Sequence, residues 1–241
     1  MLTFPNIIIA MITPFNQDGS VNYEAAVELA KKYADDGSGI LLGATTGEGA
    51  VMTEDEKLKL FKLVADELKG KTLIMGNVGT NNTIESIAMA KKAEATGVDL
   101  LLCIVPYYNK PNQDGCYAHF SAIAKATSLP LFIYNVPGRT GGSIEPETVC
   151  RLARDYDNII GLKDASGNLD FAGYVAANAP EGFHLYSGED NLTLPIIAVG
   201  GEGVITVAGH VIGKEMDSMI QAYKDGDVKK AASLHQKYLP S

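Results

Sequence analysis

The chain has 241 residues, of which 46% are hydrophobic and 20% charged, and its formal net charge is −9. This composition excludes a disordered chain, a collagen-like chain and a small disulfide scaffold. With 29 acidic residues and only three arginines, the chain also lacks the clustered lysine and arginine that a nucleic-acid-binding surface requires.

The cysteines and the first residues indicate the compartment. Cys103, Cys116 and Cys150 are widely spaced and show no metal-binding pattern, so we expect reduced thiols, with Cys103 buried in an apolar run. No basic segment precedes the apolar residues 7–12, and no apolar run reaches the roughly 20 residues that a membrane helix needs. We therefore expect a soluble, cytoplasmic protein.

Short β-branched apolar runs alternate with longer segments of helical spacing along the chain. Because these runs are apolar without polar alternation, both faces of each strand are expected to be covered, as in a parallel sheet wrapped by helices. The eight predicted strands are residues 7–12, 39–43, 72–77, 100–105, 130–134, 158–162, 184–187 and 203–206.

The segments between the strands contain helix signals. Thr53 and Glu56 form a capping-box pattern, and Gly70 marks the C-terminal stop of the same helix. Pro146 stands in the first turn of a later helix, where its missing N–H costs little. The predicted helices are residues 22–34, 54–68, 82–95, 146–154, 213–223 and 228–238.

The number of repeats favours a closed barrel over an open doubly wound sheet. A dinucleotide-binding sheet would have a glycine-rich turn after the first strand, where this chain has Thr13, Pro14 and Phe15. No linker or low-complexity segment divides the chain. We predict an α/β fold, a (β/α)8 TIM barrel, as a single domain over residues 1–241.

Functional residues of such barrels lie after the C-terminal ends of the strands. Thr45 and Thr46 follow the second predicted strand and offer hydroxyl donors to a carboxylate, although a helix-capping turn would use the same residues. Tyr107 and Tyr108 follow the fourth strand between prolines, where a stiff loop can carry a phenol to a fixed place. Ordinary packing is the alternative for this tyrosine pair.

The fifth and sixth strands end in residues suited to amine chemistry. Lys163 closes an apolar strand, so its surroundings favour the neutral amine, which can attack a ketone. Tyr134 could transfer protons and Arg139 could bind a carboxylate. The alternatives are a structural tyrosine with a surface arginine, and a lysine that extends to solvent and pairs with Asp164. The combination favours a Schiff-base site, because such a lysine needs both a proton shuttle and carboxylate donors.

Three segments carry a family resemblance: Thr45 to Glu48, Tyr134 to Gly141, and Gly161 to Asp164. In order and separation they resemble the signatures of the dihydrodipicolinate synthase family, over essentially the whole chain. The related N-acetylneuraminate lyases usually have a serine where Thr45 stands and lack the equivalent of Arg139.

The resemblance implies that Lys163 forms a Schiff base with pyruvate and that the resulting enamine attacks aspartate semialdehyde. The product would be 4-hydroxy-tetrahydrodipicolinate, a precursor of diaminopimelate and lysine, and the reaction would need no metal or organic cofactor. The implied site consists of the catalytic residues Lys163, Tyr134, Thr45 and Tyr108 and the substrate-binding residues Thr46, Arg139, Ile205 and Gly188.

The resemblance also implies a homo-oligomer, because the residue that matches Tyr108 enters the neighbouring subunit's site. The chain departs from the family pattern in having Ala44 and Gly49 around the threonine pair. Family members usually continue through further C-terminal helices, so we expect a barrel shortened at its C-terminus, with altered assembly. The alternatives are a sister pyruvate-dependent aldolase, a catalytically silent barrel, and a barrel with an intact site but low activity.

The family's positions for lysine inhibition differ in part. Glu54 and Lys57 stand where inhibited members have histidines, whereas Asn81, Glu85 and Tyr107 are kept. We therefore expect weak or absent feedback inhibition by lysine.

Overall fold

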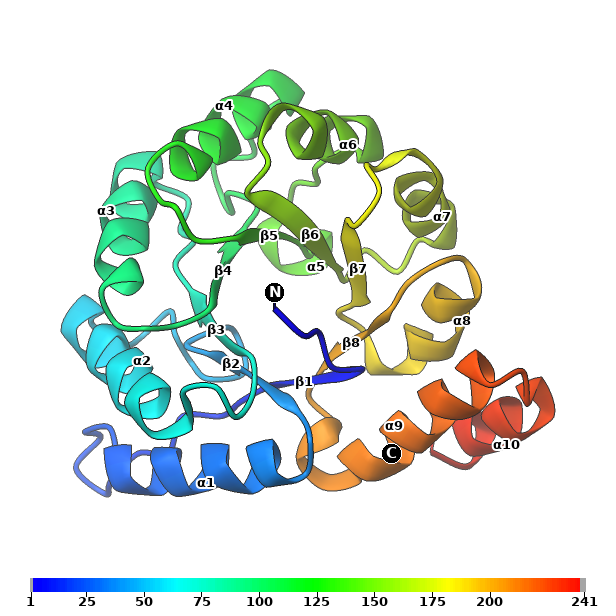
Figure 1. The fold of residues 1–241 in the computed structure, drawn as a ribbon. Helices are drawn as coiled ribbons and strands as arrows, with labels where there is room; N and C mark the ends of the chain where they lie inside the picture. Colours follow the sequence, from blue (N-terminus) through cyan, green and yellow to red (C-terminus); the bar gives the residue numbers. More distant parts are fainter. Residues whose placement is uncertain (1, 239–241) are drawn as a thin grey trace.

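The computed structural model describes residues 2–238 and contains a closed barrel of eight parallel strands in chain order (Figure 1). Each strand pairs with the next, and β8 pairs with β1. The predicted TIM barrel is therefore confirmed. The strands are β1 Ile7–Ala10, β2 Gly39–Leu42, β3 Ile74–Asn77, β4 Leu100–Ile104, β5 Leu131–Asn135, β6 Ile159–Asp164, β7 His184–Ser187 and β8 Gly203–Thr206.

Helices surround the barrel, and of the last two helices the first lies beside β8 and β1 while the second packs on its outer side (Figure 1). The predicted capping box at Thr53 is present, with the Thr53 hydroxyl accepting from the Glu56 N–H and the Glu56 carboxylate accepting from the Thr53 N–H. The helices are α1 Tyr23–Asp35, α2 Glu54–Leu68, α3 Thr83–Glu94, α4 Gln113–Ala124, α5 Pro137–Thr140, α6 Pro146–Asp155, α7 Leu169–Asn178, α8 Thr193–Ala198, α9 Gly209–Lys224 and α10 Val228–Tyr238, with the 3₁₀ turn η1 Asp190–Leu192.

The sequence prediction missed α4, α7 and the short helices α5 and α8, and it began α9 four residues too late. Gly115 and Gly173 interrupt the helical spacing of α4 and α7. The early part of α9 is hidden because Ile212, at φ −122° and ψ 28°, departs from helical geometry and divides the helix.

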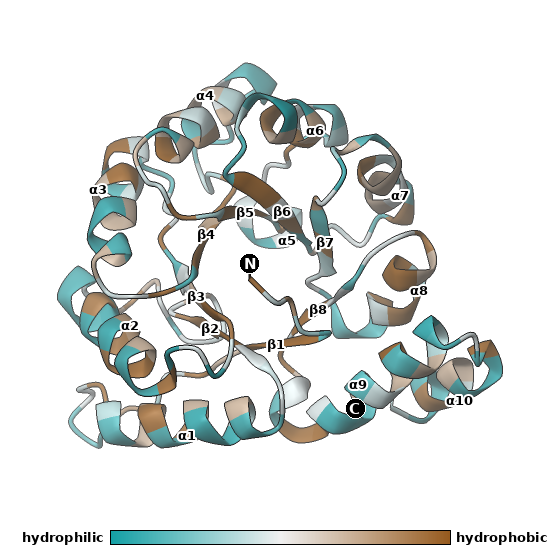
Figure 2. Cartoon of the chain, viewed as in Figure 1, coloured by the Kyte–Doolittle hydropathy of each residue, from teal (hydrophilic) through white to brown (hydrophobic). Residues whose placement is uncertain are grey.

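Apolar side chains form two layers, and the strands are accordingly the most hydrophobic part of the barrel (Figure 2). One layer fills the barrel interior, where Phe132, Tyr134, Tyr186 and Ile205 are buried. The other lies between the strands and the helices. Successive residues of a strand alternate between these layers. A residue's position in its strand therefore decides whether its side chain points into the barrel interior or toward the surrounding helices.

An irregularity in the pairing of β5 with β6 determines where Lys163 points. Leu131 pairs with Ile159 but Phe132 pairs with Gly161, so Ile160 is skipped. From there on Tyr134 stands opposite Lys163. If no residue were skipped, Lys163 would pair with Asn135 instead of Tyr134. Because side chains alternate along a strand, this shift of one residue would turn the Lys163 side chain toward the helices.

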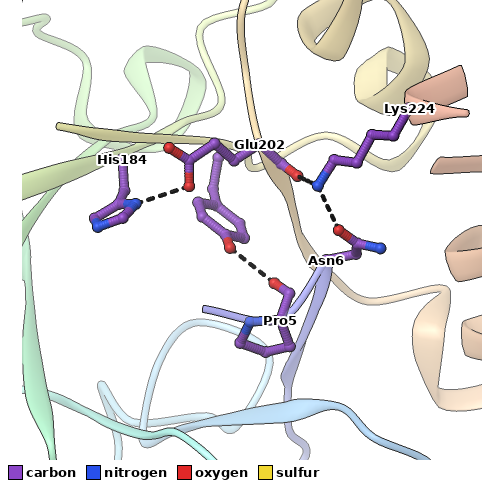
Figure 3. A network of polar contacts seen from close by, with 6 residues as sticks. Pro5, Asn6, His184, Glu202 and Lys224 are labelled. Atoms are coloured by element: carbon purple, nitrogen blue, oxygen red, sulfur yellow. Dashed lines mark hydrogen bonds and ion pairs between the residues drawn. The ribbon is translucent and has the colours of Figure 1, made fainter. Parts of the chain in front are cut away.

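The N-terminal segment lies over the middle of the barrel (Figure 1). The Phe4 ring stacks on His184 with centroids 3.9 Å apart. The Tyr186 hydroxyl donates to the Pro5 carbonyl at 2.7 Å (Figure 3). His184 Nδ1 lies 2.7 Å from a Glu202 carboxylate oxygen. These contacts leave the opposite, C-terminal end of the barrel as the open one.

All three cysteines are buried and free, as expected for Cys103 in particular. In the stretch from residue 2 to residue 238, no helix combines the length and the apolar character needed to cross a lipid bilayer.

Candidate active site

Lys163 lies near the C-terminal end of β6 with its side chain in the barrel interior. It stands in register between Tyr134 of β5 and Tyr186 of β7, both of which belong to the interior layer. Its Nζ is 4.3 Å from the centre of the Tyr134 ring. The side chain is thus enclosed, and the residue is only 5% exposed.

Burial lowers the pKa of Lys163 to about 8, because the low-dielectric interior disfavours the ammonium form. The carboxylates of Asp190 and Glu189 oppose this shift, and the Arg139 guanidinium adds to it. Within residues 2–238 Lys163 forms no ion pair. The alternative in which it extends to solvent and pairs with Asp164 is therefore wrong.

Tyr134 is buried beside the lysine. Burial raises the pKa of its phenol above the usual value, while the Thr45 hydroxyl and Arg139 act in the opposite direction. The phenol therefore carries its proton at neutral pH. A protonated phenol is a group that can donate a proton during catalysis.

The loop after β2 presents Thr45 and Thr46 at the rim of the barrel, Thr45 exposed and Thr46 half-buried. The Thr13 hydroxyl donates to the Gly47 carbonyl at 2.7 Å and ties this loop to the segment after β1. A Cβ at Gly49 would lie 1.8 Å from the Gly43 carbonyl oxygen. The loop therefore requires glycine at position 49, one of the departures from the family pattern.

A cleft of about 420 Å³ opens beside Tyr134 at this end of the barrel. Thr45, Arg139 and Thr140 line it together with the tyrosine, and Lys57, Glu85 and Tyr107 are also among its lining residues. Burial lowers the pKa of Lys57, which the carboxylate of Glu54 opposes. The cleft thus joins the surroundings of Tyr134 to the positions where the family resemblance places lysine inhibition.

Taken together, a buried amine with a lowered pKa, an adjacent phenol and a cleft with an arginine suit covalent catalysis on a carboxylated ketone. Elsewhere in residues 2–238, no group of three or more His, Cys, Asp or Glu side chains has a metal-binding arrangement.

A family model described as the dihydrodipicolinate synthetase family matches residues 3–240. The chain belongs to this family. The 4-hydroxy-tetrahydrodipicolinate synthase of Listeria innocua is 50% identical over 237 residues, which cover 97% of this chain and 80% of that protein. A crystal structure of dihydrodipicolinate synthase from Bacillus anthracis matches with a TM-score of 0.94 at 42% identity, over 98% of this chain and 81% of that one. A second, from Cyanidioschyzon merolae with lysine bound, matches with a TM-score of 0.95 at 43% identity, over 98% of this chain and 80% of that one.

Relative to these members of the family, the chain is shorter by about a fifth of their length. Its last helix pair, α9 and α10, packs together beside α8. A cavity of about 340 Å³ lies there, lined by Asp190 on one side and by Met216, Met219 and His235 among others.

Three further predicted site residues lie on β8, after β7 and in α5. Ile205 is buried in the interior layer on β8. Gly188 directly follows β7, and a Cβ there would lie 3.1 Å from Lys163 Cε and 2.8 Å from the Ala165 Cβ. Arg139 reaches the cleft from the short helix α5, which begins at Pro137.

Tyr108 is not brought into the site by its own chain. Its side chain is 88% exposed, and its backbone has a φ of 73°, in the left-handed region. That Tyr108 acts in the site of a neighbouring subunit stays a prediction.

The sequence analysis did not single out Asp190 as a residue that acts on Lys163. Its carboxylate accepts from the N–H groups of Val207 and Ala208, at 3.2 and 2.8 Å, and so lies against the loop after β8. Its signals in the sequence are its position shortly after β7, at the functional end of the barrel, and the resemblance of the segment from Ser187 to Asp190 to a segment of the family.

Proposed function

We propose that this chain condenses pyruvate with L-aspartate 4-semialdehyde to form 4-hydroxy-tetrahydrodipicolinate. The observation that carries the proposal is the buried amine of Lys163, with a pKa lowered to about 8, beside the Tyr134 phenol. The activity named for the Listeria innocua relative, at 50% identity, supports this choice of reaction.

Lys163 Nζ attacks C2 of pyruvate, and a carbinolamine forms. Tyr134 gives a proton to the departing hydroxyl, water leaves, and an iminium joins Nζ to C2. Thr45 links Tyr134 to the Tyr108 of a neighbouring subunit, so the phenol can be reprotonated from outside the enclosed site.

Loss of a proton from the pyruvate methyl group converts the iminium to an enamine. The enamine carbon attacks the aldehyde carbon of the semialdehyde, whose oxygen takes a proton and becomes the 4-hydroxyl. The semialdehyde's amino group then displaces Nζ from C2, which closes the ring and frees Lys163. One water is released overall, in the first condensation.

The remaining residues hold the two carboxylated substrates. Thr46 donates to the pyruvate carboxylate, and the backbone at Ile205 and Gly188 bounds the pocket. Gly188 suits this place because any side chain there would meet the lysine. Arg139 binds the semialdehyde carboxylate, for which the planar guanidinium offers two parallel donors. The site is complete only in an oligomer of at least two chains, because Tyr108 acts in the neighbouring one.

The choice of aldehyde is tested with Arg139→Lys. We expect kcat/KM for aspartate semialdehyde to fall roughly 10- to 100-fold, the loss of one charge-assisted hydrogen bond, in an assay that follows ring formation. The rate of borohydride trapping with pyruvate alone should stay at the wild-type value. A higher kcat/KM for an uncharged aldehyde in the wild-type protein would instead identify a sister pyruvate-dependent aldolase.

A further inference from the structure

Asp164 is a buried carboxylate for which the proposed mechanism has no task. It follows Lys163 in β6 and is 1% exposed. Because successive strand residues alternate, Asp164 lies on the helix side of the barrel wall, while Lys163 lies in the interior. It therefore cannot touch a substrate bound to the lysine.

The Asp164 carboxylate is held by donors from two different segments. One oxygen accepts from the Ser166 N–H at 3.2 Å and from the Asn135 amide at 3.4 Å, and the other accepts from the Ser166 hydroxyl at 2.9 Å. The side-chain oxygen of Asn135 in turn accepts a hydrogen bond from the Ser143 hydroxyl at 3.2 Å. This network joins the tip of β5 to the tip of β6 and to the loop that follows β6.

The network lies directly behind the two proposed catalytic groups. Asn135 follows Tyr134 as Asp164 follows Lys163, and the two pairs stand opposite each other in register. The backbone of Asp164 extends the connection to β7, since its carbonyl accepts from the Gly188 N–H at 2.6 Å. Three strand tips that carry site residues therefore meet at this one residue.

The arrangement has an energetic cost. Burial raises the pKa of Asp164 to about 6, the nearby charge of Glu189 adds to the rise, and the Ser166 and Asn135 donors oppose it. Across residues 2–238 no cation pairs with this carboxylate. A neutral side chain would avoid this desolvation cost. The benefit of the carboxylate must therefore come from the Asn135 and Ser166 donors that its two oxygens hold in place.

We infer that Asp164 is a positioning residue, whose carboxylate fixes the tips of β5 and β6 so that Lys163 and Tyr134 stay in catalytic register. The inference rests on the proposed function, in which those two residues react. Asp164 acts through them and does not itself contact the reacting atoms.

The test compares three variants of the full chain. Asp164→Asn keeps the size but turns one acceptor into a donor, which either faces the Asn135 amide and the Ser166 N–H or forces the Ser166 hydroxyl to change from donor to acceptor. The double variant Asn135→Asp with Asp164→Asn exchanges the two groups, so that the new amide donates to the new carboxylate and its oxygen faces the Ser166 hydroxyl. Only the Ser166 N–H then loses its acceptor, and the Ser143 hydroxyl still faces an acceptor. Asp99→Asn is the control, because Asp99 is a half-buried carboxyl with a raised pKa at the other end of the barrel, bonded to the Ile74 N–H.

We expect kcat of Asp164→Asn to fall roughly 100-fold, the loss that a misplacement of about 1 Å produces, with KM for pyruvate within about threefold of wild type. The borohydride-trapping rate should fall in parallel, and the exchanged pair should recover most of both rates. Asp99→Asn should leave kcat and the trapping rate unchanged, because its amide oxygen can still accept from the Ile74 N–H.

A wild-type trapping rate in Asp164→Asn would overturn the inference, as would a folded exchanged pair that stays as slow as the single variant. If Asp164→Asn does not fold, the trapping rate and kcat of the exchanged pair alone test the inference. Failure of the proposed function looks different, because the wild-type protein itself would then form no adduct with pyruvate.

Discussion

The chemistry that we propose depends on the Nζ of Lys163 being neutral often enough to attack a ketone. Its environment comes from the barrel wall, since the residues around it are the interior side chains of β5, β7 and β8. Burial is the largest influence on its pKa, ahead of the opposing carboxylates. A surface lysine with the same neighbours in sequence would stay protonated at neutral pH.

The lowered pKa of Lys163 predicts how the rate of Schiff-base formation changes with pH. Only the neutral amine reacts, so the rate of borohydride trapping at limiting pyruvate should rise about tenfold per pH unit below the pKa and level off above about 8. Stopped-flow or quenched trapping between pH 6 and pH 9.5 measures this rate. A rate that is still rising tenfold per unit at pH 9.5 would show that the lysine keeps an ordinary pKa.

At the scale of elements, strand register decides which groups meet. The skipped residue between β5 and β6 turns Lys163 to the interior and Asp164 to the helix side. Gly188 after β7 then supplies the room that the lysine needs, because a Cβ there would lie 3.1 Å from Lys163 Cε and 2.8 Å from the Ala165 Cβ.

Gly188→Ala should therefore displace the lysine. We expect roughly a 100-fold loss of kcat, as for a misplacement of about 1 Å, and a loss of about 1–3 kcal/mol in unfolding free energy from overpacking. Gly173→Ala in α7 is the matched control, since nothing lies within 4 Å of the added Cβ. That variant should keep its activity and gain about 0.5–1 kcal/mol. Equal activities of the two variants in the same assay would refute the steric argument.

The sequence predicted every strand and placed Tyr134 and Lys163 at neighbouring strand ends, because apolar runs and strand-end polar residues are local patterns. It missed α4 and α7, whose glycines weaken the helical spacing, and the beginning of α9, where Ile212 is not helical. It also placed the end of the sixth strand before Lys163, whereas β6 continues to Asp164. The tasks of Asp164 and Asn135 could not be predicted, since they depend on a skipped residue in the pairing of two strands.

At the scale of the whole molecule, the site that we propose is divided between two chains. Lys163, Tyr134 and Gly188 lie close together within one chain, but Tyr108 is exposed on the loop after β4. The chain covers about 80% of the length of the Listeria innocua relative, and the proposed relay needs a residue from a second chain. Oligomerisation is therefore the part of the proposal that most needs its own test.

Complementation between two inactive variants provides that test. Lys163→Ala lacks the amine, and Tyr108→Phe lacks the hydroxyl. In a mixed dimer, the chain that keeps Lys163 receives an intact Tyr108 from its partner. After subunit exchange of equal amounts, random pairing gives about a quarter of the wild-type activity. Activity no greater than the sum of the separate variants would place Tyr108 outside the neighbouring site.

The central claim is that Lys163 forms a covalent Schiff base with pyruvate. Borohydride reduction of the full chain in the presence of pyruvate, followed by peptide mass mapping, tests it most directly. We predict a single reduced pyruvate adduct, on the peptide that contains Lys163, with the other lysines unmodified. Recovery of that peptide unmodified, or an adduct on a different lysine, would contradict the account.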